Sequence, residues 1–218
     1  MLKRLLDLVI AGGTLLAFLP VGLPIAILLR LTGEGEIFYA QERIGKYGNK
    51  FGLLKFATML KNSPNIGTGT VTVKNDPRVL PAGKFLRKTK LNEIPQILNV
   101  LKGDMSIVGP RPLTQQTFDF YSPEVQEKIK ELQPGLTGIG SIVFRDEESI
   151  IAASDLEPLE CYEQVISPYK GQLEMWYHQH RSFGVDLKLI FLTAWAILFS
   201  GSHLHTKLLS DLPPRPFD

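Results

Sequence analysis

The sequence predicts an α-rich α/β protein with an apolar membrane element at its N-terminus. Three observations support this fold class: an uncharged apolar run near the N-terminus, short strand-like segments followed by helical patterns, and a second apolar segment near the C-terminus. The 218 residues suffice for one domain with a buried core in addition to a membrane element. A single cysteine excludes an internal disulfide framework and fits a reducing compartment, and a net charge of +2 argues against a nucleic-acid partner.

The N-terminal apolar run is long enough to enter a bilayer. From Leu8 to Leu29 no charged residue occurs, and this length can cross the ~30 Å hydrocarbon core. The run exceeds the apolar region of a signal peptide and lacks a small-residue cleavage site. Pro20 and Pro24 each remove a backbone donor, which predicts a bend.

The predicted bend is compatible with two membrane topologies. If the helix turns back at Pro20, both halves lie in one leaflet, and Lys3, Arg4 and Arg30 all meet the anionic cytoplasmic face. An ordinary kinked helix that spans the bilayer explains the same residues, because membrane helices tolerate proline. Hydropathy alone does not distinguish the two.

Short elements follow the apolar run. Strand patterns at residues 37–40 and 51–56 flank a basic, glycine-bearing turn. The stretch from Asn62 to Asp76, rich in Asn, Gly, Thr and Pro, predicts a long loop, which we expect to move over a ligand. Apolar residues at helical spacing from Leu91 to Leu101 predict an amphipathic helix that ends near Gly103.

The second half of the chain is predicted to be mainly helical. Helices are expected at residues 123–132 and 157–181, with a strand or turn at 135–144 between them. The apolar segment 185–199 is short for a membrane span, so an in-plane interfacial helix is favoured over a buried core helix. The proline-containing tail at 210–218 is expected to be flexible.

Standard catalytic motifs are absent from the sequence. It contains no Walker-type loop, no nucleophile elbow and no cysteine and histidine set with zinc spacing. His178 and His180, like His203 and His205, stand two residues apart, and such positions point to different faces of a helix. We therefore expect surface roles for them. The Gly-Thr run at residues 67–70 is only a weak phosphate signal.

Charged and amide side chains are dense between residues 84 and 112. The cations precede a predicted helix, whose N-terminal dipole also favours anions. Arg111 stands between two prolines, which fits a preset bidentate contact to phosphate. Glu93 lies among cations that should lower its pKa, and it can serve as nucleophile, base or magnesium ligand. Together with a membrane segment, this cluster predicts phosphate chemistry on a lipid.

The cluster also carries a family resemblance. The stretch KTKLNEIPQILNVLKGDMSIVGPRP, residues 88–112, resembles the signature of the bacterial sugar transferases, the monotopic phosphoglycosyl transferases. Further motifs follow the order of that family and cover nearly the whole expected catalytic core. They are KRLLD with the proline-broken run, FYAQERIG at 38–45, KFATM at 55–59, DPR at 76–78, PGLTG at 134–138 and DLKLIFLTAW at 186–195.

The resemblance implies an architecture and an activity. It implies a re-entrant membrane helix hairpin over residues 1–31, a cytoplasmic-face catalytic domain over 32–209 with an interfacial helix at 185–200, and a flexible tail at 210–218. The implied location is the bacterial inner membrane. The implied reaction is Mg²⁺-dependent transfer of a sugar-1-phosphate from a UDP-sugar to polyprenyl (undecaprenyl) phosphate, with release of UMP. Downstream glycosyltransferases and a second copy of the chain are candidate partners, and no motif identifies the sugar or the glycan pathway.

Two positions depart from the family pattern. Relatives use an Asp-Glu pair whose aspartate attacks the sugar-bearing phosphorus, but here the pair is Asn92-Glu93, and an amide cannot be that nucleophile. Either Glu93 is the nucleophile, or the lipid phosphate attacks directly while Glu93 binds magnesium. Leu19 stands where the family often has serine, so the bend depends more on Pro20 and Pro24.

Position and charge suggest roles for the remaining cations. We expect Arg111 and Arg87 to clamp phosphates, and Lys55 to neutralise the charge that develops during transfer. Arg78 is a further candidate for phosphate binding, although together with Asp76 it borders the long loop and is more simply explained as organising that loop.

The alternative to an enzyme is a catalytically silent membrane scaffold for glycosyltransferases. Asn92 favours this interpretation because it replaces the nucleophile. The presence of Lys55, Arg87, Glu93 and Arg111 argues against it, since a scaffold has less need of a complete phosphate-binding cluster.

Overall fold

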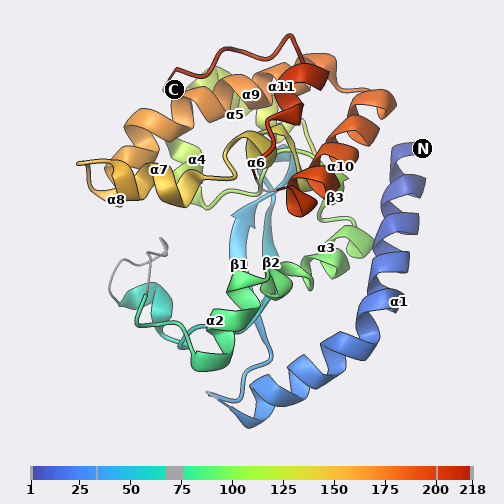
Figure 1. Cartoon of the computed structure of the whole chain (residues 1–218), viewed down its shortest axis with the longest axis vertical. Coiled ribbons are helices and arrows are strands. Elements are labelled where there is room, and N and C mark those ends of the chain that lie inside the picture. The colour runs from blue at the N-terminus through green and yellow to red at the C-terminus, as the bar shows by residue number, and fades with distance from the viewer. Residues whose placement is uncertain (1, 33, 67–75, 200, 217–218) are drawn as a thin grey trace.

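The computed structural model describes residues 2–32, 34–66, 76–199 and 201–216. Figure 1 shows a long bent helix along one side, a two-stranded hairpin near the centre, and a group of helices above the hairpin. The elements are α1 (Leu2–Leu31), β1 (Phe38–Ile44), β2 (Lys50–Phe56), α2 (Pro81–Lys88), η3 (Leu91–Glu93), α3 (Gln96–Lys102), β3 (Ser106–Val108), α4 (Gln115–Asp119), α5 (Pro123–Lys130), β4 (Gly135–Thr137), α6 (Ile139–Val143), α7 (Glu147–Ala153), α8 (Pro158–Cys161), η4 (Tyr162–Ile166), α9 (Ser167–His180), α10 (Phe183–Leu198) and α11 (Leu204–Leu208), with further single turns at Lys46–Gly48 and Ser63–Asn65.

Helix α1 is one continuous helix that bends about midway (Figure 1), not two separate helices of a hairpin. Pro20 and Pro24 lie inside it, and a helix can pass through proline with a kink because only the bond donated by that residue is lost. In the described part of the chain, α1 is the helix that is long and apolar enough to cross a membrane. Of its most apolar stretch, only 11% is buried.

Both ends of α1 pack against the rest of the protein. Near its start, the Asp7 carboxylate accepts hydrogen bonds from Ser106 Oγ at 3.0 Å and the Ile107 backbone N–H at 2.9 Å. Near its end, Ile25 and Leu29 are buried in a small apolar cluster with residues of β2 and α2. The helix is therefore fixed at two places, with its middle part between them.

The central hairpin pairs β1 and β2 in antiparallel register. The strand predicted at residues 37–40 is observed as β1, but it continues to Ile44. Its polar second half, residues 41–44, stays in the strand because residues 50–53 of β2 pair with it. Asn99 of α3 holds the other edge of β2: its Oδ1 accepts from the Leu54 N–H at 2.9 Å, and its Nδ2 donates to the Gly52 carbonyl at 2.8 Å.

The helix predicted from Leu91 begins later than expected. A 3₁₀ turn, η3, comes first, and α3 starts at Gln96 directly after Pro95. Pro95 has no N–H to donate to the Leu91 carbonyl, so the helical hydrogen bonds of α3 begin after it and the apolar spacing extends further than the helix does. The predicted end is confirmed, since Gly103 terminates α3 with φ 98°. Glu93 consequently lies in the turn that leads into α3.

A short parallel pair, β3 and β4, shapes the turn that carries Arg111. A Cβ on Gly109 would lie 2.1 Å from the Gln133 carbonyl oxygen, so only glycine allows this approach. The strand or turn predicted for residues 135–144 is correct for β4 but wrong beyond it, where α6 forms.

Helices α4 to α11 form the upper part of the molecule in Figure 1, and most of the largest apolar core lies among them. The helices predicted at residues 123–132 and 157–181 are confirmed as α5 and as the run from α8 to α9. The C-terminal segment docks as far as it is described: the Tyr169 hydroxyl donates to the Pro213 carbonyl at 2.8 Å, and Trp176 Nε1 donates to Asp211 at 3.0 Å. Flexibility of this tail stays a prediction.

Candidate active site

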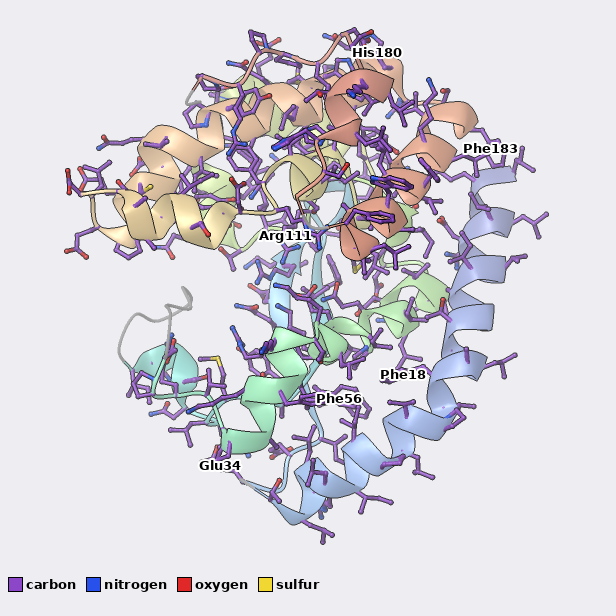
Figure 2. All side chains as sticks on the ribbon, in the orientation of Figure 1. Phe18, Glu34, Phe56, Arg111, His180 and Phe183 are labelled. Atoms are coloured by element: carbon purple, nitrogen blue, oxygen red, sulfur yellow. The ribbon has the colours of Figure 1, made fainter. Side chains whose placement is uncertain are left out.

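Glu93 and Arg111 meet where η3 faces the turn after β3. Arg111 Nη2 lies 3.7 Å from Glu93 Oε1, and their side chains are 44% and 25% exposed. Figure 2 shows Arg111 between the hairpin and the helices above it. Both groups are therefore reachable by a ligand in this part of the surface.

Several cations surround the Glu93 carboxylate. Burial alone would raise its pKa, but Arg111, Lys55, Lys90 and Arg87 together lower the pKa of Glu93 below its ordinary value. Glu93 in turn raises the pKa of Arg111. The structure thus brings together the four residues that the sequence placed at the centre of the chemistry, and Glu93 is ionised at neutral pH.

The cations also repel one another. Burial lowers the pKa of Lys55 to about 8, and Arg43, Arg111 and Arg87 contribute to the lowering while Glu93 opposes it. Burial and the neighbouring Arg111 lower the pKa of Arg43 to about 10. Among the described residues, Arg111, Lys55 and Arg43 share Glu93 as a neighbouring carboxylate, and one negative charge does not balance three positive ones. An incoming phosphate would reduce their mutual repulsion.

Arg43 belongs to this group, although the sequence analysis gave it no role. Its Nη1 donates to the Pro112 carbonyl at 3.2 Å, and its Nη2 bonds the Gln41 Oε1. Alternation could have identified it, because residues 39, 41 and 43 share one face of β1, and Tyr39 pairs with Lys55 of β2. Lys90, which has φ 59° at the start of η3, is a second cation near Glu93 that received no role.

Asn92 lies inward, next to Glu93. It is 5% exposed, and its Oδ1 has no hydrogen-bond partner among the described residues. An amide has no nucleophilic oxygen of the carboxylate kind, so Glu93 is the group in this turn that can carry negative charge to a ligand.

Arg78 is located differently from the other candidate phosphate-binding residues. It is buried and forms an ion pair with Asp76, with Nη2 and Oδ2 2.6 Å apart. Its Nη1 also donates to the Ser63 carbonyl at 2.8 Å and the Ile66 carbonyl at 3.0 Å. These contacts fit organisation of the chain around the loop better than binding of a phosphate. Most of the loop itself, including the Gly-Thr run at 67–70, lies outside the described residues.

The donors that could hold a metal ion are few. The described residues contain no group of three His, Cys, Asp or Glu side chains that could form a complete metal site. His178 instead contacts Glu131 at 2.7 Å. Mg²⁺ is commonly held by one or two carboxylates together with substrate phosphates. Glu93, partly exposed and ionised, fits that arrangement and is the residue that would hold the ion.

The amino-acid sequence matches the family model described as bacterial sugar transferase over residues 1–200. It is 32% identical to the exopolysaccharide production protein ExoY of Rhizobium meliloti, with 93% of this chain and 88% of that protein covered. It is 35% identical to the uncharacterized sugar transferase EpsL of Bacillus subtilis, with 91% and 88% covered.

A longer relative carries a more specific name. The UDP-glucose:undecaprenyl-phosphate glucose-1-phosphate transferase of Escherichia coli is 34% identical over 198 residues, which cover 89% of this chain and 40% of that protein. The match to the family model extends over the apolar helix, the hairpin, Glu93 and Arg111. The expectation of a sugar-phosphate transferase is confirmed, and the chain belongs to the bacterial sugar transferase family.

Proposed function

We propose that the chain transfers a sugar-1-phosphate from a UDP-sugar to polyprenyl phosphate, which gives a polyprenyl-diphosphate-sugar and UMP. The observation that carries this proposal is the ionised Glu93 among Arg111, Lys55 and Arg87. Such a cluster suits a diphosphate donor and a phosphate acceptor, both of which are anionic. The printed name of the Escherichia coli relative supports a UDP-sugar donor and an undecaprenyl phosphate acceptor.

The packing of α1 supports a re-entrant position in the membrane. A straight helix of 30 residues would extend ~45 Å and exceed the ~30 Å core of a bilayer. Lys3 Nζ lies 2.6 Å from Asp186 of α10, whereas Leu29 packs at the other end of the helix against the hairpin cluster. Contacts of both ends of α1 with one folded body support a helix that enters and leaves the membrane on the same face.

Exposed apolar side chains mark the surfaces that meet lipid. Leu16 in the middle of α1 is 71% exposed. On α10, Phe183, Leu187 and Phe191 are exposed at spacings of four residues, while Leu189 is buried. These exposed side chains support an α10 that lies in the interface with the stripe toward lipid. On this proposal the Glu93 cluster works at the cytoplasmic membrane surface, where polyprenyl phosphate presents its head group.

Two routes to the product are compatible with this site. In the first, a Glu93 oxygen attacks the sugar-bearing phosphorus, the bond to UMP breaks, and an oxygen of the lipid phosphate then displaces Glu93. In the second, the lipid phosphate oxygen attacks that phosphorus directly, and UMP leaves in the same step. Arg111 and Lys55 stabilise the phosphate charge in both routes. In the second route, magnesium bound at Glu93 would supply Lewis-acid neutralisation of phosphate oxygens.

The test is release of UMP in nanodiscs that contain undecaprenyl phosphate, with magnesium and a panel of UDP-sugars. We expect release by the wild type and a loss of at least ~100-fold in Glu93→Gln. Glu163→Gln, which changes an exposed carboxylate in η4, is the matched control and should retain the wild-type rate. Release that is unchanged in Glu93→Gln would contradict the proposal.

The same assay separates the two routes. In nanodiscs that contain the donor but no undecaprenyl phosphate, covalent capture by Glu93 predicts a burst of one UMP per enzyme, whereas direct attack by the lipid phosphate predicts no UMP release. Asn92, an amide where relatives have the nucleophilic aspartate, favours one further candidate function, the silent scaffold. That function predicts no release by the wild type with any sugar and a gain of release in Asn92→Asp.

A further inference from the structure

A cavity of about 170 Å³ lies between α6, the C-terminal end of α10 and the segment around α11. Figure 1 shows these elements in the upper part of the molecule. The described residues that line the cavity include neither Glu93 nor Arg111. Its volume is close to the ~150 Å³ of a cavity that can hold benzene, so a phosphate group can enter it. The proposed transfer reaction gives this cavity no role.

The polar part of the cavity wall is cationic. Arg145, which follows α6, and Arg215 of the C-terminal segment both line it, and Asp146 is the carboxylate beside them. Arg215 Nη2 lies 3.1 Å from Asp146 Oδ2. Two guanidinium groups and one carboxylate give the described wall a net charge of +1 even when its histidines are neutral. The wall therefore favours an anion.

The two histidines after α10, for which the sequence predicted surface roles, also line this cavity. The ring centres of His203 and His205 lie 6.1 Å apart. Burial lowers the pKa of His205, and the nearby His203 and Arg215 lower it further, so a positive environment surrounds this ring. An imidazole N–H can donate to a phosphate oxygen in either protonation state. In the described part of the chain, these histidines belong to no group of three donors that could hold a metal ion.

The remaining wall is apolar and adjoins the exposed stripe of α10. Ala196 and Trp195 line the cavity. The Trp195 ring centre lies 6.0 Å from that of Phe191 and 4.3 Å from that of Phe199. Leu198, two turns after Phe191 on the same face, is 74% exposed. A lipid whose acyl chains lie along this stripe can therefore place its head group in the cavity.

We propose that this cavity binds the head group of an anionic phospholipid of the surrounding membrane, with the acyl chains along α10. The inference uses the proposed interfacial position of α10 but not the transfer reaction. The charge of the wall selects an anionic head group over a zwitterionic one, and the apolar stripe selects a lipid over free phosphate. A lipid bound here would tie the end of α10 and the segment after it to the head-group layer.

Tryptophan fluorescence tests the site directly. The chain has two tryptophans: Trp195 lines the cavity, whereas Trp176 is only 6% exposed. Phosphatidylcholine nanodiscs would contain the same small mole fraction of a lipid with brominated acyl chains, either phosphatidylglycerol or phosphatidylcholine. Bromine quenches a tryptophan that it contacts, and Trp195→Phe gives the background from Trp176. We expect severalfold stronger quenching by the anionic lipid, and equal quenching by the two lipids would overturn the proposal.

A charge substitution tests the cationic wall. Arg145→Gln should lower the excess quenching by the anionic lipid about fivefold, the effect expected for one basic side chain beside an anionic lipid. Lys207→Gln removes an exposed cation of α11 that is not among the described lining residues. This control should keep the excess. An equal loss in both variants would indicate diffuse attraction by surface charge and would overturn the proposal.

A size substitution tests the cavity at constant charge. Ala196→Leu places a larger apolar side chain in the cavity wall and should remove the excess quenching. Ala194→Leu makes the same change at an exposed position of α10 outside the described wall, and it should keep the excess. An excess that persists in Ala196→Leu would mean that the lipid does not enter the cavity, which overturns the proposal.

Inorganic phosphate distinguishes a lipid from a free anion. Added in millimolar amounts at constant ionic strength, it should leave the excess quenching in place, because it gains nothing from the apolar stripe. If phosphate abolished the excess, the cavity would be a site for free phosphate and the lipid proposal would be wrong.

Native mass spectrometry gives a readout that needs no tryptophan. Wild type released from nanodiscs of phosphatidylcholine and phosphatidylglycerol should retain one phosphatidylglycerol, and folded Arg145→Gln should retain less of it than Lys207→Gln does. Wild type that retains both lipids equally, or neither, would contradict the proposal. These measurements do not use UMP release, so failure of the proposed transfer reaction and failure of the lipid site are told apart.

Discussion

Two charged regions lie on either side of Arg111, and they are organised in opposite ways. On the ligand side, the partly exposed Glu93 lies among more cations than it can neutralise. Behind the turn, Lys170 is 2% exposed and is paired with Glu147. The first region leaves charge available for an anion, whereas the second satisfies its ammonium internally. We infer that the first region acts on the substrate and that the second supports it.

The largest effect is expected from Arg111→Ala. Removal of this guanidinium takes away the nearest cation to Glu93 and a contact to the transferred phosphate, so kcat/KM should fall ~100-fold to ~1,000-fold. The rate of UMP release at several donor concentrations gives kcat/KM for both proteins. Lys128→Ala, which removes an exposed cation on α5, should leave the rate within about twofold of wild type because surface ion pairs contribute little. An equal loss in both variants would show that only general positive charge matters.

A smaller effect is expected when Lys55 loses its proton. Since its pKa is about 8, the side chain is charged at neutral pH and becomes neutral above that value. Donor kcat/KM should therefore decline above pH 8, by about tenfold for each further pH unit where only the charged form works. Lys55→Arg, which stays charged, should move this decline to higher pH. A wild-type profile that is flat from pH 7.5 to 9.5 would remove Lys55 from the mechanism.

The smallest effect on catalysis is expected from the supporting region. Lys170→Met retains much of the side-chain volume but breaks the ion pair with Glu147. Because Glu147 is 30% exposed and regains solvent, the cost should be only about 1–2 kcal/mol, or ~2–8 °C in Tm. The donor KM should change less than twofold. A large change in KM with unchanged Tm would reverse the assignment of the two regions.

Local patterns predicted the long elements correctly. The uncharged run predicted α1, the residues bounded by glycine predicted β2, and the apolar segment near the C-terminus predicted α10. Short elements were missed or misplaced: α4 and α7 have few residues, and Pro95 shortened the helix expected from Leu91. Apolar spacing indicates which face of a segment is buried, but the missing N–H of Pro95 and the extent of strand pairing set where α3 begins and where β1 ends.

The candidate site shows the same limit. Glu93 and Arg111 were predictable because charge density and flanking prolines are visible in the sequence. Arg43 was missed because its relation to Lys55 arises from strand pairing. Contacts of this kind depend on tertiary structure.

One measurement tests the central claim most directly. A UDP-sugar labelled with ¹⁴C in the sugar and ³²P in the phosphate attached to the sugar is incubated with the enzyme in nanodiscs containing undecaprenyl phosphate, and both labels are counted in the extracted lipid. Transfer of a sugar-1-phosphate predicts that both labels enter the lipid in equal molar amounts and that Glu93→Gln abolishes both. Entry of the ¹⁴C label alone, with the ³²P retained in UDP, would mean that the enzyme transfers the sugar without its phosphate and would contradict the account.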